Sequence, residues 1–156
     1  MKAVLIVVGK TKMSFLNEGF DFYLQRISHY LNIEIIVINN IKNTKNLSHD
    51  QIKVMESTQT LARIQSGDFV ILLDEKGKEL GSLDFSVFLQ EKMSAGLKKV
   101  VFITGGAFGF SDQLIQRANE KIALSKMTFT HEMVRMIFAE QLYRALTILK
   151  GEGYHH

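Results

Sequence analysis

The chain has 156 residues, a length typical of one domain, so we expect a single domain over residues 1–156. Its hydrophobic content of 46% is too high for a disordered chain, and no apolar run approaches the roughly 18 residues that a membrane helix needs. The absence of cysteine excludes disulfides, cysteine zinc sites and thiol nucleophiles, and it fits a cytoplasmic protein. A net charge of +3 neither requires nor excludes a nucleic-acid partner.

Hydrophobic periodicity predicts that strands and helices alternate along the first half of the chain. The expected elements are a strand over Ala3–Val8, a helix over Ser14–Leu31, a strand over Ile33–Ile38, a polar loop over Asn39–Leu47 and a helix from Ser48 to about Gln65. The last of these helices begins with Ser48 and Gln51 in the spacing of a capping box, which favours a helix start at that point.

The second half continues the same alternation. The expected elements are a strand over Phe69–Leu73, a helix over Ser82–Ala95, a strand over Val100–Ile103, a glycine loop over Gly105–Gly109, a helix over Ser111–Glu120, a short strand over Ile122–Leu124, a loop over Ser125–Thr130, a helix over His131–Lys150 and a tail over Gly151–His156. Strands that are nearly all apolar and are separated by helices indicate an α/β fold with a parallel sheet and helices on both faces.

Three segments follow strands late in the chain and are candidates for a ligand pocket. They are Leu73-Asp74, Gly105–Gly109 and Ser125–Thr130. Ligands of open parallel sheets bind outside the carboxyl ends of the strands, so these segments are expected to converge there. From the residues alone, the glycine loop is either a ligand contact or a tight connection capped by Ser111, and the loop from Ser125 is either a backbone cradle for a planar ligand or a plain connection with Met127 and Phe129 in the core.

Two familiar phosphate-binding motifs are not matched. The run Val8–Thr11 ends like a P-loop, but the glycine that should stand five residues before Gly9 is Val4. The glycine loop has the spacing G-G-x-x-G and follows the fourth strand, whereas the dinucleotide fingerprint is G-x-G-x-x-G after the first. The sequence therefore argues against a P-loop nucleotidase and a standard dinucleotide fold.

The final helix is apolar over most of its circumference, which predicts more burial than one sheet face requires. We favour a subunit interface over a helix enclosed within one chain. Arg135 falls on the apolar side, so it is expected to need partners, either a tail carboxylate or a ligand, with a surface ion pair to Glu132 or Glu140 as the alternative. The histidines of the short tail suit RNA contact or proton transfer, although a frayed end is the more usual fate of such residues.

Five stretches carry a resemblance to a known family. They are Val101–Gly109, Leu124–His131, Ala139–Ala145 leading to Tyr154-His155, Leu73-Asp74 and Val7–Gly9. Over its whole length, the chain resembles the ribosomal RNA large subunit methyltransferase H family of the SPOUT superfamily of knotted methyltransferases. The loop and tail motifs together are specific, whereas the glycine loop alone is not.

The resemblance implies a parallel-sheet SPOUT fold whose C-terminal part forms a deep trefoil knot, a feature that is nearly absent from other proteins. It also implies a homodimer that binds S-adenosylmethionine in its knot loops, without a metal. The implied activity is methylation of N3 of a pseudouridine in the 23S ribosomal RNA of the assembled ribosome.

Site residues follow from the same resemblance, position by position. Expected cofactor contacts are Leu73, Gly105, Leu124, Ser125, Lys126, Met127, Thr128 and Phe129, mostly through the backbone. His131, Arg144, Tyr154 and His155 match positions near the methyl-transfer pocket or the RNA. His155, Arg144 or a water molecule is the candidate that helps the base nitrogen lose its proton.

Two positions depart from the family pattern. Thr130 stands where the family usually has proline, so this loop is either softer or uses the threonine hydroxyl to cap the following helix. His156 stands where a basic residue usually ends the chain, which puts one phosphate contact in doubt. Two other functions compete with the methyltransferase: a flavodoxin-like nucleotide or flavin protein, and a ribosome-binding module without activity.

Overall fold

The computed structural model describes residues 1–156 and has a five-stranded sheet in the order β2-β1-β4-β3-β5. All four neighbouring pairs are parallel. The strands are β1 (Lys2–Val8), β2 (Asn32–Ile38), β3 (Phe69–Glu79), β4 (Lys99–Thr104) and β5 (Glu120–Ala123). The central strands β1 and β4 are buried almost throughout because helices cover both faces, which confirms the predicted α/β parallel sheet.

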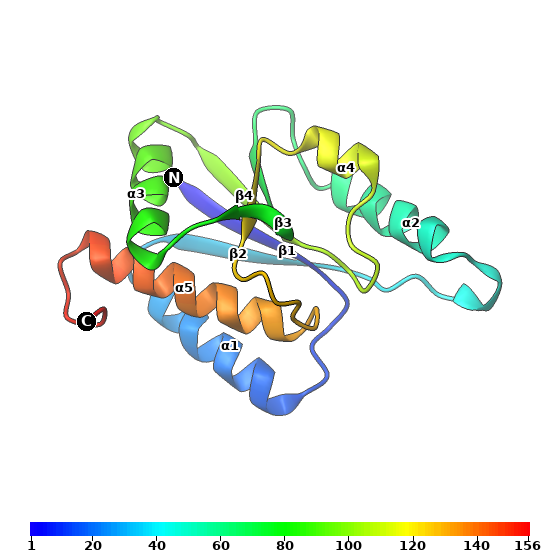
Figure 1. The fold of residues 1–156 in the computed structure, drawn as a ribbon, viewed down its shortest axis with the longest axis horizontal. Helices are drawn as coiled ribbons and strands as arrows, with labels where there is room; N and C mark the ends of the chain where they lie inside the picture. The colour runs from blue at the N-terminus through cyan, green and yellow to red at the C-terminus, as the bar shows by residue number, and fades with distance from the viewer.

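The helices divide between the two faces of the sheet (Figure 1). The face with three helices carries α1 (Ser14–Ile27), α3 (Ser82–Ser94) and α5 (Met133–Leu149), and the other carries α2 (His49–Leu61) and α4 (Asp112–Arg117). A short 3-10 turn, η1 (Thr44–Asn46), precedes α2. The predicted capping box of Ser48 and Gln51 is present, and the Ser111 hydroxyl accepts the Leu114 amide at the start of α4. No helix combines the length and apolar character needed to cross a membrane.

Three helices end three or four residues earlier than predicted. The first stops at Ile27 instead of Leu31, the second at Leu61 instead of Gln65, and α4 at Arg117 instead of Glu120. The early end of α4 has a clear cause, because Asn119 draws the chain into strand pairing. Its amide donates to the Val70 carbonyl and its side-chain oxygen accepts the Val70 amide, both at 2.8 Å.

The third strand is longer than its apolar run. It continues from Leu73 to Glu79, and its pairing with β5 shifts register, so that both Leu73 and Lys78 face Ile122. A Cβ atom at Gly77 would lie only 2.6 Å from the backbone of Lys121 and Ile122, so glycine is required at this crossing. Backbone pairing, not burial of side chains, holds this polar half of the strand. A prediction based on hydrophobic periodicity therefore cannot find it.

Burial of α5 takes place within one chain. The helix lies between α1 and α3 and covers the sheet, with the ring of Phe138 4.8 Å from that of Phe102 on β4. Eight of its residues are buried, including Leu142 and Tyr143. Packing inside the chain therefore accounts for the burial of these eight residues, and the subunit interface stays a prediction.

Arg135 is 2% exposed, and its partners differ from the ionic ones that were predicted. Its guanidinium donates to the carbonyls of Val8 and Gly9 and, at 3.0 Å, to the Thr11 hydroxyl. It forms no ion pair with a tail carboxylate, Glu132 or Glu140, so these three expected partners are wrong. One turn earlier, the Glu132 carboxylate accepts the amides of Lys12 and Met13. The start of α5 thus fixes the loop that leaves β1.

Candidate functional site

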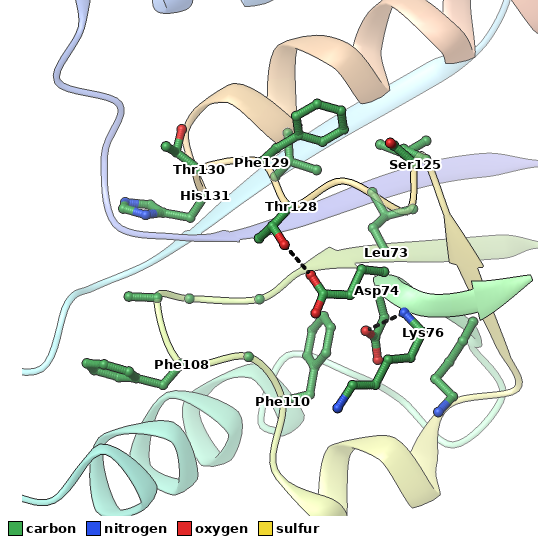
Figure 2. A pocket seen from close by; sticks show the side chains of 18 of the residues that line it. Leu73, Asp74, Lys76, Phe108, Phe110, Ser125, Thr128, Phe129, Thr130 and His131 are labelled. Atoms are coloured by element: carbon green, nitrogen blue, oxygen red, sulfur yellow. Dashed lines mark hydrogen bonds between the residues drawn. The ribbon is translucent and has the colours of Figure 1, made fainter. Parts of the chain in front are cut away.

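A cavity opens at the carboxyl edge of the sheet, where the three predicted segments converge. Its volume is about 680 Å³, within the usual range for small-molecule sites. The end of β3, the glycine loop after β4 and the loop after β5 form its walls (Figure 2). It is lined by Lys53, Leu73, Asp74, Glu75, Lys76, Gly105, Gly106, Ala107, Phe108, Gly109, Phe110, Ile115, Lys121, Leu124, Ser125, Met127, Thr128, Phe129, Thr130, His131 and Val134.

Short polar contacts shape the loop between β5 and α5. The Ser125 hydroxyl accepts the Met127 amide at 2.9 Å, and the Thr130 hydroxyl accepts the Met133 amide at 3.2 Å. Between them, the Thr128 hydroxyl donates to the Glu75 carboxylate at 3.0 Å, a contact across the cavity that Figure 2 shows as a dashed line. Of the two alternatives for Thr130, the structure has the helix cap.

Glycine allows the loop after β4 to fold back on itself. Gly106 and Gly109 form an isolated antiparallel bridge, and Gly109 has a φ of +79°, in the left-handed region that favours glycine. The tight turn leaves the loop's carbonyl and amide groups at the wall of the cavity, and Phe108 is 36% exposed at its rim. The loop is therefore both a tight connection and part of the cavity wall.

Seven of the eight expected cofactor residues line the cavity, and Lys126 does not. The Lys126 ammonium instead lies 3.4 Å from the Glu79 carboxylate, outside the lining. Met127 is 77% exposed, so the interpretation that places its side chain in the core is wrong. Phe129 is half-buried, and its ring turns toward the start of α5 (Figure 2).

The four expected catalytic residues lie in two separate places. His131 lines the cavity, with its imidazole 4.0 Å from the Glu132 carboxylate. Arg144, Tyr154 and His155 lie near the other end of α5. Arg144 lies eleven positions after Met133, where α5 begins, and this much helix spans about 16 Å. One chain therefore does not bring the four residues together.

At that far end, the tail folds back on the protein and is not frayed. The Tyr154 hydroxyl donates to Glu140 at 3.1 Å, its ring packs edge-on against Tyr143, and the Arg144 guanidinium lies over it. Arg144 also donates to Glu140, and its guanidinium is 3.5 Å from His155 Nδ1. This tail cluster of Glu140, Arg144, Tyr154 and His155 places its imidazole next to a fixed cation.

Ionisation in the tail cluster follows from these contacts. Burial, together with the hydrogen bond to Tyr23, raises the pKa of Tyr154, and the bond to Glu140 raises the pKa of Arg144. A hydrogen bond of 2.6 Å to Glu152 raises the pKa of Tyr30 to about 12. The tyrosines are therefore neutral donors at neutral pH, and Arg144 keeps its charge.

Known proteins resemble the chain over its whole length. A family model described as "Predicted SPOUT methyltransferase" matches residues 1–155. The chain belongs to the SPOUT methyltransferase family. Membership implies the knotted fold of SPOUT proteins, as the resemblance had suggested.

Curated relatives align with this chain over nearly their entire length. Proteins named ribosomal RNA large subunit methyltransferase H from Parabacteroides distasonis, Cytophaga hutchinsonii and Christiangramia forsetii are 51%, 50% and 47% identical to this chain over 156 residues. The alignments cover all of this chain and 99%, 100% and 99% of the three relatives. The loops of the cavity and the tail cluster thus both lie inside the region of similarity.

Sequence reasoning did not name several residues that line the cavity. The cavity wall includes Phe108, Phe110, Lys53 and Lys121. Phe108 stands within the glycine loop and Phe110 directly follows it, so the two aromatic residues had a signal in the sequence. Lys53 and Lys121 had none, because solvated lysines are common on helices and strands. No group of three or more His, Asp or Glu side chains is arranged to hold a metal.

Glu56 is the other residue that was missed, and it lies behind the glycine loop. Its side chain is 8% exposed, its Oε2 has no hydrogen-bond partner, and a Cβ atom on Gly106 would lie 2.3 Å from that oxygen. The helical spacing of Ile52, Glu56 and Thr60 places it on the buried face of α2, which was the available signal. Burial raises the pKa of Glu56.

Replacing Glu56 with glutamine is expected to stabilise the protein at neutral and alkaline pH but not in acid. The raised pKa in the folded chain means that ionisation opposes folding, and the penalty grows as pH rises above the ordinary value of about 4.3 toward the folded value. Urea unfolding of wild type and Glu56→Gln at about pH 4 and about pH 8 measures the difference. A larger gain at the lower pH would contradict this account.

Proposed function

We propose that the protein transfers a methyl group from S-adenosylmethionine to N3 of a pseudouridine in the 23S ribosomal RNA of the assembled ribosome. The relatives carry the name of a ribosomal RNA methyltransferase, which supports the reaction and the substrate class. The observation that carries the proposal is the cavity, since seven residues expected to contact the cofactor line its wall. We place the reaction in the cytoplasm, where ribosomes work.

The cavity suits S-adenosylmethionine in size and chemistry. Apolar groups such as Leu73, Leu124 and Phe129 offer surface to a planar adenine, and the loop backbones offer donors and acceptors to its edge. The acidic side chains of Asp74 and Glu75 lie at the same wall and suit a cofactor that carries a sulfonium and an ammonium group. The same wall also carries Lys76, which suits the cofactor carboxylate.

The bound cofactor supplies an electrophilic methyl group, so the chain has to orient the RNA base and ease the loss of its N3 proton. His131 at the cavity and His155 in the tail cluster are the candidates for accepting or relaying that proton. Arg144 beside His155 favours an anionic base through its fixed positive charge. Tyr154 holds Arg144 by stacking under its guanidinium.

A homodimer completes this site in our proposal. Because about 15 Å of helix separates Arg144 from Val134, the residue of α5 that lines the cavity, we infer that a second copy supplies the tail. Two defective chains test the idea when they are mixed. One lacks residues 154–156, and the other carries Gly109→Val, which strains the loop at a φ of +79°.

Restored methyl transfer in the mixture is the expected result, because a mixed dimer has one intact cavity facing one intact tail. Each variant alone should be inactive. If the mixture stays inactive although light scattering and subunit exchange show mixed dimers, the tail acts within its own chain and the proposed arrangement fails.

Replacing Thr128 with valine is expected to weaken S-adenosylmethionine binding by about tenfold, because the contact with Glu75 that holds the loop across the cavity is lost. Thr128→Ser keeps the hydroxyl and serves as the matched control. Calorimetric titration with the cofactor measures both dissociation constants. Equal weakening by serine and valine would show that the hydroxyl has no such role.

Methyl transfer itself tests the proposed function. The protein is incubated with labelled S-adenosylmethionine and either intact ribosomes or naked 23S RNA, both from cells that lack the enzyme. Label on ribosomes but not on naked RNA is the expected result. Cofactor binding without transfer to either would overturn the substrate, and the absence of cofactor binding would favour a ribosome-binding module without activity. A coloured or fluorescent purified protein would favour a flavin protein.

A further inference from the structure

Two exposed rings are stacked at the rim of the cavity. His49, the first residue of α2, and Phe108, in the glycine loop, have ring centroids 4.0 Å apart and planes inclined by 15°. His49 is exposed, and Phe108 is 36% exposed. The pair joins two elements that are distant in sequence, and in Figure 2 Phe108 projects over the start of α2, away from Leu73 and Ser125.

The position of this pair relates it to the cavity. Phe108 lines the cavity directly. Lys53 also lines it and follows His49 by four residues on α2, so both side chains lie on the same side of the helix. The stacked rings therefore lie at the mouth of the cavity. Phe108 belongs to its lining but is not one of the expected cofactor residues, and His49 lies outside the lining.

Several lysines lie on the segments that carry or adjoin the stacked rings. Lys42 and Lys45 are exposed in the connection that leads from β2 into α2, and neither forms an ion pair. Lys53 pairs only with the highly exposed Asp50, and Lys76 and Lys121 line the cavity without an ion-pair partner. Because β1, β2 and β4 run parallel, this connection and the glycine loop leave the same edge of the sheet (Figure 1).

Stacked aromatic surfaces beside unpaired lysines match the way proteins bind single-stranded nucleic acid, in which bases stack on rings and phosphates contact cations. We propose that His49 and Phe108 form a stacking platform for an unpaired base of the RNA substrate, next to the nucleotide that enters the cavity, with Lys42 and Lys45 contacting its phosphates. This inference rests on the proposed function and adds a specific RNA-contact surface to it.

Steady-state methylation of ribosomes by His49→Ala and Phe108→Leu tests the platform. Loss of one base stack should raise the KM for ribosomes by about tenfold in each variant. The dissociation constant of S-adenosylmethionine should change less than twofold in His49→Ala, which lies outside the cavity lining, and should rise by a smaller factor than the KM in Phe108→Leu. Phe108→Trp keeps a stacking surface and should restore a KM near that of wild type. The double variant Lys42→Ala/Lys45→Ala should raise the KM and weaken its dependence on salt, whereas Lys98→Ala, exposed at the opposite edge of the sheet, should do neither.

The possible outcomes separate this inference from the proposed function. If the wild-type enzyme is active and both ring variants have the same KM for ribosomes as the wild type, the platform is overturned and the proposed function is not. A rise in the cofactor dissociation constant as large as the rise in KM would overturn it too, since the rings would then act on the cavity. Wild-type enzyme that binds the cofactor but methylates no ribosomes would overturn the proposed function, and the platform with it.

Discussion

Deletion of residues 154–156 is expected to reduce methyl transfer to ribosomes by at least a thousandfold and to leave S-adenosylmethionine binding unchanged. The deletion removes the ring that packs under Arg144 and the imidazole beside it, and Arg144 lies about 15 Å along α5 from Val134 in the cavity lining. Loss of a general base alone accounts for a factor of about 10² to 10⁴. Single-turnover transfer and calorimetric cofactor titration of the same preparation measure the two properties.

Point variants show which tail residue causes the loss. His155→Ala should lose most of the activity if its imidazole accepts the proton, whereas Tyr154→Phe keeps the ring under Arg144 and should lose less than about tenfold. Full turnover by His155→Ala with saturating ribosomes would rule out that role for His155. A thermal melt of each variant shows whether loss of the tail cluster has unfolded the chain.

Substitution of Arg135 by alanine is expected to lower the free energy of unfolding by about 3–5 kcal/mol. The guanidinium is 2% exposed, and it is the donor that satisfies the carbonyls of Val8 and Gly9. Without it these acceptors lose their partners, and the loop that leaves β1 is released from α5. Urea unfolding at neutral pH measures the change.

Arg135→Lys is the matched control for that experiment. A lysine keeps the positive charge, but one ammonium group lacks the planar fork that reaches three acceptors at once. We expect an intermediate loss of stability. A loss below about 1 kcal/mol for the alanine variant would show that the loop is held by other contacts, such as Glu132 with the amides of Lys12 and Met13.

Much of the fold could be predicted from the sequence, because strands and helix starts are marked by residues that are close together in the chain. The apolar runs of β1 and β4, the capping box at Ser48 and the cap at Ser111 all appear in the structure. The polar extension of β3 to Glu79 did not show in the sequence, because it depends on backbone pairing with β5. The partners of Arg135 were also missed, since they are backbone groups more than 120 residues away.

The candidate site was predicted in two different ways. Topology placed three loops at one edge of the sheet, and the structure has a cavity there. The individual residues came from the family resemblance, because backbone contacts leave almost no trace in side-chain identity. The stack of His49 on Phe108 requires the glycine loop to lie against the start of α2, a proximity that neither pattern nor spacing contains.

Nucleoside analysis of the ribosomal RNA tests the central claim most directly. Ribosomes from cells that lack the enzyme are incubated with the protein and S-adenosylmethionine, the 23S RNA is digested, and the nucleosides are separated and weighed by mass spectrometry. The account predicts one new nucleoside, a pseudouridine that has gained a single methyl group on N3. Methylation on another base or on ribose, or no change at all with active cofactor binding, would contradict it.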